Sequence, residues 1–164
     1  MKIYTKKGDE GFTSRLGVPK VRKSDRFFEV LGTIDELNAN IGSCIHAAAQ
    51  ADNDDIQAAL GVVQPELMCI SSLVAAVGGD TPAGVSLDQS AVDRLERHID
   101  ASWNNLPKLT HFIQPGGCEL ACRLHLARTV CRRTERVLVT FVDDGQKIPE
   151  VIGRYINRLS DLLF

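Results

Sequence analysis

The sequence predicts an all-α protein, a bundle of five helices preceded by an extended, glycine-containing N-terminal arm. Apolar residues recur at three- and four-residue steps in five segments, the periodicity of helices packed on a common core. Residues 4–23 lack this periodicity and carry glycines and polar side chains instead. The 164 residues suit one hydrophobic core, and no repeat or linker divides them. We therefore expect one domain over 1–164, with an arm at 1–24 and a helical bundle at 25–164.

Composition narrows the choice of compartment and partner. The net charge is −2, which gives general nucleic-acid binding little electrostatic support. No run of about 18 apolar residues is present and the N-terminus lacks a signal-peptide pattern, so we expect neither a membrane span nor secretion. Five cysteines without a CxxC pair indicate reduced thiols and a cytoplasmic location.

The arm is polar and contains two glycines, Gly8 and Gly11. Glycine permits positive φ, so successive backbone N–H groups can converge on an anion. Hydroxyl and ammonium groups accompany them on Thr5, Lys6, Lys7, Thr13, Ser14 and Lys23. The Walker pattern of a strand followed by Gly-Lys-Ser/Thr is absent. Two interpretations stay open for the arm alone: a phosphate-binding loop, or a mobile surface segment with at most a short strand.

The first helix is expected at about residues 26–50, with Ser24 or Asp25 as its N-cap. Its core stripe consists of Val30 or Leu31, Ile34, Leu37, Ile41 and Ile45. Asp35 lies on the opposite, polar side, where a solvated carboxylate is the ordinary interpretation.

Three further helices are expected at about 54–77, 88–104 and from Pro149 onward, since proline is favoured in a first helical turn. Asn157 lies within the last of them. Phe112 lies in the connector after the third helix, where its ring could belong to the core or face a ligand.

The longest helix is expected from Pro115 to about Val142. Its apolar seam consists of Leu120, Leu124, Ala127, Cys131, Thr134, Leu138 and Phe141. At about 100° per residue, a separate arc collects His125, Arg128, Arg132, Glu135 and Arg136. Arginines on one stripe of a helix repel one another unless an anion lies nearby to compensate their charge. The guanidinium group can also donate two parallel hydrogen bonds to a phosphate. We therefore interpret the arc as a wall of a phosphate-handling site rather than a solvated basic face.

Cys118, Cys122 and His125 share helical spacing and could mimic a metal site. Cysteine is also a common buried apolar residue. We expect no metal ligands in the chain for that reason.

Four ordered motifs match one family. They are Tyr4-Thr5-Lys6 with Gly8-Asp9, Gly11 and Thr13; Gly32-Thr33 with Asp35-Glu36-Leu37-Asn38; Phe112 with Pro115-Gly116-Gly117 and the run Leu124–Arg136; and Asn157-Arg158-Leu159-Ser160-Asp161. Over nearly its whole length the chain closely resembles the ATP:cob(I)alamin adenosyltransferases of the propanediol-utilisation (PduO-type) class. Two departures stand out. Phe27 occupies a position where family members often carry Arg, and Arg15 to Pro19 replace a glycine-rich continuation.

The resemblance implies a transferase that is a homotrimer, with ATP and corrinoid sites between adjacent subunits. The implied reaction moves the 5′-deoxyadenosyl group of ATP to the cobalt of cob(I)alamin and releases triphosphate. Because Co(I) is itself a strong nucleophile, no catalytic Ser, Cys or His is needed. The polyanionic leaving group instead needs positive charge and aligned N–H donors.

The resemblance also implies roles for single residues. Arg132 would stabilise the departing triphosphate, and Phe112 would help remove the axial base of cob(II)alamin, which makes the cobalt easier to reduce. Asp35 and Arg128 would pair across subunits. The nucleotide, with Mg²⁺, would be held by Thr5, Lys6, Lys7, Gly8, Thr13, Ser14, Lys23, Arg132, Arg133, Glu135, Arg136 and Asn157. A flavin reductase or a B12-dependent enzyme is a candidate further partner.

Two other interpretations use the same helices. One is a non-catalytic nucleotide sensor, which the loss of Phe112, Arg132 or Asp35 would have favoured, and all three are present. The other is a helical oligomerisation module whose arginine stripe meets an acidic partner. That module leaves the glycine- and hydroxyl-containing arm unexplained.

Overall fold

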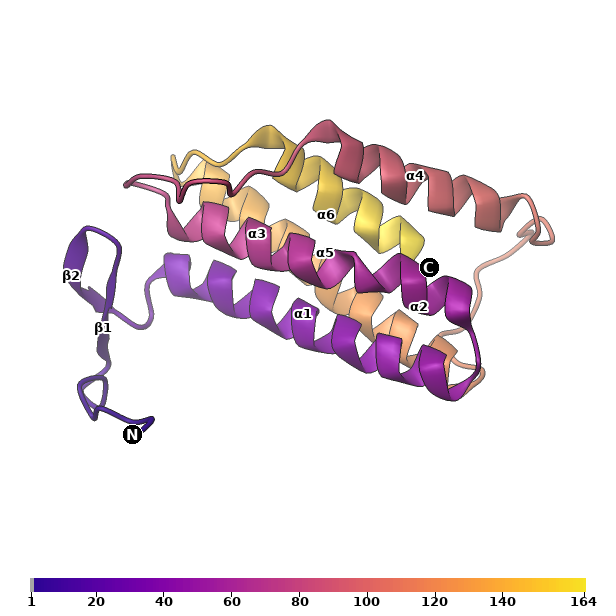
Figure 1. The fold of residues 1–164 in the computed structure, drawn as a ribbon, viewed down its shortest axis with the longest axis horizontal. Helices are drawn as coiled ribbons and strands as arrows, with labels where there is room; N and C mark the ends of the chain where they lie inside the picture. Colours follow the sequence, from indigo (N-terminus) through magenta and orange to yellow (C-terminus); the bar gives the residue numbers. More distant parts are fainter. Residues whose placement is uncertain (1) are drawn as a thin grey trace.

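The structure is a computed structural model that describes residues 2–164. Its helices run side by side in an elongated bundle, and the residues before the first helix lie at one end of it (Figure 1). The helices are α1 (Arg26–Gln50), α2 (Asp54–Gly61), α3 (Val63–Ala75), α4 (Gln89–Trp103), α5 (Glu119–Asp143) and α6 (Glu150–Leu162). Since α2 and α3 follow one another along a single rod, the architecture is the predicted five-helix bundle.

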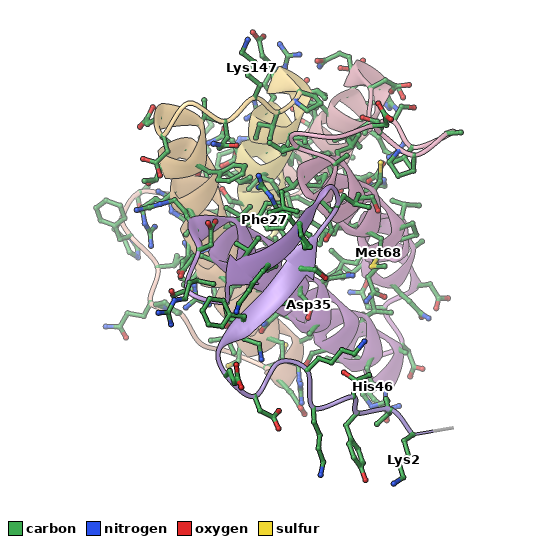
Figure 2. All side chains as sticks on the ribbon, turned by 90° about the vertical axis from the view of Figure 1, so that its left-hand side faces the viewer. Lys2, Phe27, Asp35, His46, Met68 and Lys147 are labelled. Atoms are coloured by element: carbon green, nitrogen blue, oxygen red, sulfur yellow. The ribbon has the colours of Figure 1, made fainter. Side chains whose placement is uncertain are left out.

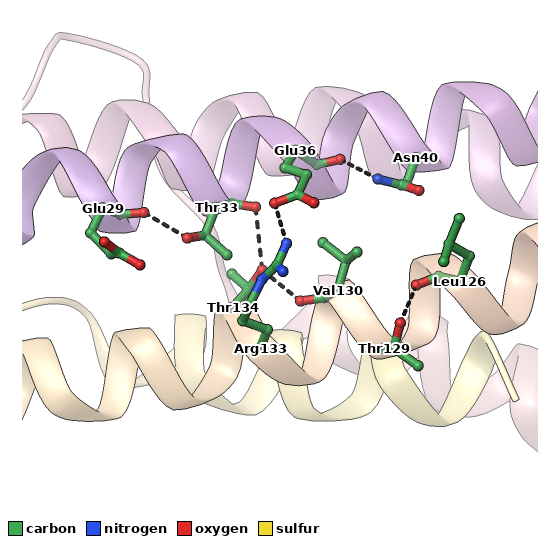
Figure 3. A network of polar contacts seen from close by, with 9 residues as sticks. All are labelled: Glu29, Thr33, Glu36, Asn40, Leu126, Thr129, Val130, Arg133 and Thr134. Carbon is green, nitrogen blue, oxygen red and sulfur yellow. Dashed lines mark hydrogen bonds and ion pairs between the residues drawn. The ribbon is translucent and has the colours of Figure 1, made fainter.

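The two longest helices, α1 and α5, are antiparallel and form the centre of the bundle. Polar pairs mark their register from end to end: Arg26 with Asp144, Glu36 with Arg133, and Ser43 with Arg123. Figure 3 shows the middle of this interface, where the buried Thr134 hydroxyl donates to the Thr33 carbonyl oxygen at 3.4 Å and to the Val130 carbonyl oxygen at 3.0 Å. The predicted seam of α5 is confirmed, because all of its members are buried except the half-buried Leu124.

The helix expected at 54–77 is present as the rod Asp54–Ala75, with an interruption at one residue, Val62, between α2 and α3. Pro65 explains the break, because proline has no N–H to donate to the carbonyl of Gly61 and its ring crowds that carbonyl. The new helix α3 begins at Val63, which places Pro65 in its first turn, where the missing N–H costs nothing.

Taken together, Asp54–Ala75 is long and apolar enough to cross a membrane by length and composition alone. A core helix passes the same test. Leu60, Leu67 and Ile70 of this rod are buried in the core of the bundle, and the rod lies against α1.

Helix starts follow local capping chemistry. Asp25 caps α1, since its side chain accepts from the Phe27 N–H at 2.9 Å. The central helix α5 begins at Glu119 and not at Pro115 as predicted. Gly117 has a φ of +106°, a conformation outside the helical region that keeps the preceding chain out of the helix.

The N-terminal segment contains a hairpin where the sequence predicted at most one short strand. Strand β1 (Phe12–Arg15) pairs antiparallel with β2 (Val18–Arg22), and the register shifts between Thr13 and Arg15. Gly17 turns the chain with a φ of +73°. Valines in β2 favour a strand, and Pro19 is tolerated because the two-stranded sheet has open edges.

Candidate functional site

The predicted phosphate-binding residues of the N-terminal segment surround a tight loop. Lys6 and Gly11 both have positive φ, at 60° and 79°. A Cβ added to Gly8 would lie 2.8 Å from Lys23 Nζ, so the Lys23 ammonium lies close against the loop backbone at Gly8. The Lys23 N–H also donates to the Gly11 carbonyl oxygen at 2.9 Å. The fold thus brings Lys23 to the glycine loop from 12 to 15 residues away in sequence. Thr5, Lys7 and Ser14 are exposed beside it, and Thr13 is half-buried in β1.

The arginines in the second half of α5 differ in whether a carboxylate pairs with them. Arg132 is exposed, and among residues 2–164 no carboxylate lies within ion-pair distance of it. Arg133 instead pairs with Glu36 of α1 (Figure 3). Arg136 Nη1 donates to the Arg132 carbonyl oxygen at 3.1 Å. Arg132 is therefore an exposed guanidinium without an ion-pair partner in the described chain.

An open pocket of about 550 Å³ lies between α1 and α5, at the end of the bundle that carries the hairpin. Its lining consists of Ser24, Arg26, Glu29, Arg133, Arg136, Val137 and Thr140. Three guanidinium groups and two hydroxyls make it a surface suited to phosphate oxygens. Carboxylates already pair with Arg26, at 2.8 Å from Asp144, and with Arg133, so Arg136 is the cation here without an ion-pair partner in the described chain.

A second groove of about 330 Å³ lies on the other side of α5, against α6. Its lining consists of Glu135, Leu138, Val139, Val142, Asp143, Ile148 and Gly153. Asn157 Nδ2 donates to Glu135 Oε1 at 2.8 Å, so the two predicted nucleotide residues meet across α5 and α6. Apolar walls with a carboxylate and an amide at the rim suit a base and its sugar.

The predicted pair Asp35 and Arg128 is not formed within the chain. Asp35 is exposed on α1 and makes no ion pair with any described residue. Arg128 Nε is buried and has no hydrogen-bond partner within residues 2–164, while its guanidinium lies 5.8 Å from the centre of the Phe164 ring. Neither Asp35 nor Arg128 is thus paired with an opposite charge within the described chain.

Phe112 is fully exposed, so it is not a core residue. The next residue, Ile113, lines a cavity of about 530 Å³ at the end of the bundle opposite the hairpin (Figure 1). The lining consists of Ile99, Ser102, Trp103, Leu106, Pro107, Leu109, Ile113, Asp161, Leu162 and Phe164. The sequence analysis missed this cavity. The available signal was a connector rich in apolar residues that follow no helical period, which a surface loop without a ligand does not need.

Cysteines do not form a metal site in the described part of the chain. No group of three His, Cys, Asp or Glu side chains there is arranged to hold an ion. Cys118 and Cys122 are exposed free thiols. Burial raises the pKa of the Cys44 thiol to about 11 and that of Cys131 to about 12, so both are neutral core residues.

Known proteins resemble this chain over its full length. A family model described as cobalamin adenosyltransferase matches residues 3–164. The corrinoid adenosyltransferase PduO of Salmonella typhimurium is 38% identical over 165 residues, which cover the whole chain and 48% of that protein. The corrinoid adenosyltransferase of Bacillus subtilis is 39% identical, with 83% of its length covered. The chain thus spans about half of the first relative and most of the second.

The same likeness extends to three dimensions. A variant PduO-type ATP:corrinoid adenosyltransferase from Lactobacillus reuteri, complexed with cobalamin and ATP, superposes with a TM-score of 0.86. It is 32% identical, and the match covers 99% of this chain and 87% of that one. Sequence, family model and fold agree, and the chain belongs to the cobalamin adenosyltransferase family.

Proposed function

We propose that this protein transfers the 5′-deoxyadenosyl group of ATP to the cobalt of a cob(I)alamin-type corrinoid. The Co(I) electron pair forms a bond to C5′, the C5′–O bond breaks, and triphosphate leaves with the bonding electrons. The observation that carries the proposal is the free guanidinium of Arg132 on a chain that belongs to this family over residues 3–164. Charge develops on the leaving phosphate oxygen, and a preorganised cation stabilises it most in the transition state.

Phosphate binding is divided between the N-terminal loop and α5. The loop supplies backbone N–H groups around Gly8 and Gly11 with the Lys23 ammonium beside them. From α5, Arg132 and Arg136 supply positive charge. Arg133 contributes indirectly, since Glu36 holds it against α1. Mg²⁺ is expected to arrive with ATP, because it binds mainly through substrate phosphates and keeps several waters.

The nucleoside fits the groove between α5 and α6. Glu135 lines this groove and accepts a hydrogen bond from Asn157, which fixes the orientation of both side chains before the ligand arrives. The Asn157 Oδ1 and the second Glu135 oxygen remain free to accept from ribose hydroxyls or the adenine amino group. Apolar contact with Val139 and Val142, both exposed in the groove, would cover the base.

The corrinoid fits the apolar cavity beside Phe112. A corrin ring is a large macrocycle with apolar faces, and five exposed large apolar side chains line the cavity, namely Trp103, Leu106, Leu109, Ile113 and Phe164, with Phe112 directly before Ile113 in the sequence. A fully exposed phenylalanine next to such a cavity has no packing role in the chain. We propose that its ring occupies the axial position on the cobalt and excludes the base.

A homotrimer would complete the site. The glycine loop lies at the far end of the bundle from Phe112, so a site that uses both within one chain would be stretched along the bundle (Figure 1). Asp35 is exposed and the half-buried Arg128 forms no ion pair with the described residues, so the two charges would pair between neighbouring copies. A second chain can therefore bring a loop to an α5 surface and pair these charges in one step.

Cofactor supply and compartment follow from the same chemistry. Cob(II)alamin must gain one electron before transfer, so a reductase of the flavin class is the partner we propose, with a B12-dependent enzyme as acceptor of the product. The five cysteines are free, which is consistent with the cytoplasmic location we propose.

The test is direct. Purified protein is mixed with MgATP and cobalamin that has been chemically reduced to Co(I), and the visible spectrum of the corrinoid is followed. Conversion of the Co(I) spectrum to that of adenosylcobalamin, with one triphosphate released per corrinoid, is the expected result. Binding of ATP without any corrinoid conversion would identify a nucleotide sensor instead.

A further inference from the structure

The hairpin and the bundle meet at one side-chain contact that the proposed reaction does not use. The Arg15 guanidinium, in β1, lies 4.9 Å from the centre of the Phe27 ring, in the first turn of α1. Figure 2 looks onto this end of the molecule and shows the hairpin in front, with Phe27 at the start of α1 behind it.

Phe27 is held in place from behind. Its side chain is 2% exposed, and the Phe28 ring meets it edge-on with centroids 5.1 Å apart and planes at 88°. The ring face that receives Arg15 is therefore fixed by the core of the bundle. A cation on a fixed, largely desolvated ring face is attracted by the ring quadrupole more strongly than on an exposed one.

Arg15 also reaches the turn after α3. Its Nη2 would lie 3.8 Å from a Cβ placed on Gly78, a residue with a φ of +85°. No carboxylate of residues 2–164 forms an ion pair with Arg15. The Arg15 guanidinium thus contacts the face of the Phe27 ring and lies close to the turn at Gly78.

The other cation–ring contacts of the hairpin stay inside it. Lys20 Nζ and the Arg22 guanidinium lie 4.4 and 4.7 Å from the Phe12 ring centre, and Phe12 belongs to β1. They stiffen the hairpin without linking it to the helices. Arg15 alone among these three cations joins the hairpin to the bundle.

We infer that Arg15 is a positioning residue for the nucleotide site, a latch that seats the glycine loop on the bundle by stacking on Phe27. Thr13 and Ser14 directly precede Arg15, and the hairpin returns the chain to Lys23, so the latch sets where these proposed phosphate ligands lie. If the loop lies in its binding position in only a fraction of the molecules, the apparent dissociation constant for ATP equals the intrinsic constant divided by that fraction, so ATP binds more weakly. Bound ATP then reseats the loop, which leaves the chemical step unchanged. This inference rests on the proposed function for its kinetic readout.

The experiment compares Arg15→Ala with Lys20→Ala, which removes the same charge and the same type of contact from within the hairpin. Arg15→Ala is expected to raise the KM for ATP about tenfold, equivalent to about 1.4 kcal/mol, with kcat within about twofold of wild type. Lys20→Ala should change the KM by less than about threefold. Arg15→Lys, which retains a cation for the ring, should recover most of the loss.

A second readout does not depend on catalysis. In the absence of ATP, chymotrypsin should cleave the N-terminal segment of Arg15→Ala several-fold faster than that of Lys20→Ala, with unchanged unfolding temperature of the bundle. If wild type fails to adenosylate cobalamin, the proposed function is wrong, and the cleavage rates still decide the latch. Equal cleavage rates and equal ATP KM values for the two alanine variants would overturn it, as would a kcat loss without a KM change.

Discussion

The two ends of the bundle differ in chemistry. At the hairpin end, Arg26, Arg133 and Arg136 line an open polar pocket, and the lysines of the N-terminal segment lie nearby. At the opposite end, Trp103 and Phe164 line a cavity whose walls are mostly apolar, and Phe112 projects beside it. The polar pocket lies between α1 and α5, whereas the apolar cavity is formed by α4, the connector that follows it and the end of α6.

This difference matches the two substrates of the proposed reaction. ATP brings a polyanion that needs cations and N–H donors, whereas a corrinoid brings a broad apolar ring that needs contact area. The helix α5 runs from one end to the other, and Arg132 lies between them on its outer surface. Because the two surfaces are separate, a substitution at one can change the affinity for its substrate without changing the affinity for the other. The reacting atoms of the two substrates would then have to meet over α5.

The largest effect is expected at Arg132, which lies on α5 between the two surfaces. Arg132→Ala should lower kcat by about 10²–10³, because it removes a cation that acts on charge developing in the transition state. The measurement is adenosylcobalamin formation from cobalamin supplied as Co(I). Since Arg132 is exposed, the unfolding temperature should stay close to that of wild type. A rate within about threefold of wild type would remove Arg132 from the catalytic role.

Phe112→Ala tests the apolar end alone. With cob(II)alamin and a mild reductant, the rate should fall at least about tenfold, because the axial base stays bound and the cobalt is hard to reduce. With cobalamin supplied as Co(I), the rate should stay within about threefold, and the KM for ATP should not change. Stability should be unaffected, since the ring is fully exposed. Equal losses in both cobalt assays would contradict the proposed role.

Asp35→Asn and Arg128→Ala test whether the site is shared between copies. Each should lower the rate about tenfold, because removal of one partner strands the other charge. Sedimentation equilibrium should show a trimer for the wild type and for both variants. A stable and fully active monomer would disprove the shared site.

Two variants, one at each end of the bundle, should change the KM for one substrate each, with smaller effects than those above. Trp103→Ala should raise the KM for corrinoid severalfold and leave the KM for ATP unchanged, because Trp103 lines only the apolar cavity. Arg136→Ala should do the reverse, since Arg136 lines only the polar pocket. If either variant shifts both KM values together, the two surfaces are coupled and the contrast fails.

The smallest effect concerns the core that both ends share. Burial raises the pKa of Cys44 to about 11 and that of Cys131 to about 12, above the value of 9.0 for a free thiol. An unfolded chain would lose these protons first as the pH rises above about 9, so their contribution to stability is present below pH 9 and is lost toward pH 11–12. Denaturant titrations at pH 8 and pH 10 should show a modest loss of stability, which Cys131→Ala should reduce.

Much of the fold could be predicted because helical periodicity is a local signal. The α5 seam from Leu120 to Phe141 and the capped start of α1 at Asp25 were confirmed. The break at Val62 was also encoded locally, by Pro65, and was overlooked. The second strand of the hairpin was not expected, because its only sequence signals are Val18 and Val21 around a proline.

The sequence predicted which residue types form the candidate site better than it predicted which side chains contact one another. Helical periodicity placed Arg128, Arg132 and Arg136 on one arc, whereas Arg133 was assigned to the site by the family resemblance alone. Only the packing of α1 against α5 assigns Arg133 to Glu36 and leaves Arg132 free. The cavity beside Phe112 was missed because its walls come from α4, the connector and α6, which no local pattern relates.

The sequence by itself determined the helices, the buried face of each and the supply of cations and glycines for a phosphate site, since these depend on residue spacing and intrinsic conformational preference. Tertiary structure decided which of those groups meet: Asn157 with Glu135, Arg15 with Phe27, and Lys23 with Gly8. Such meetings depend on the rotation and register of whole helices against one another. Many side chains set these jointly, and no single stretch of the chain specifies them.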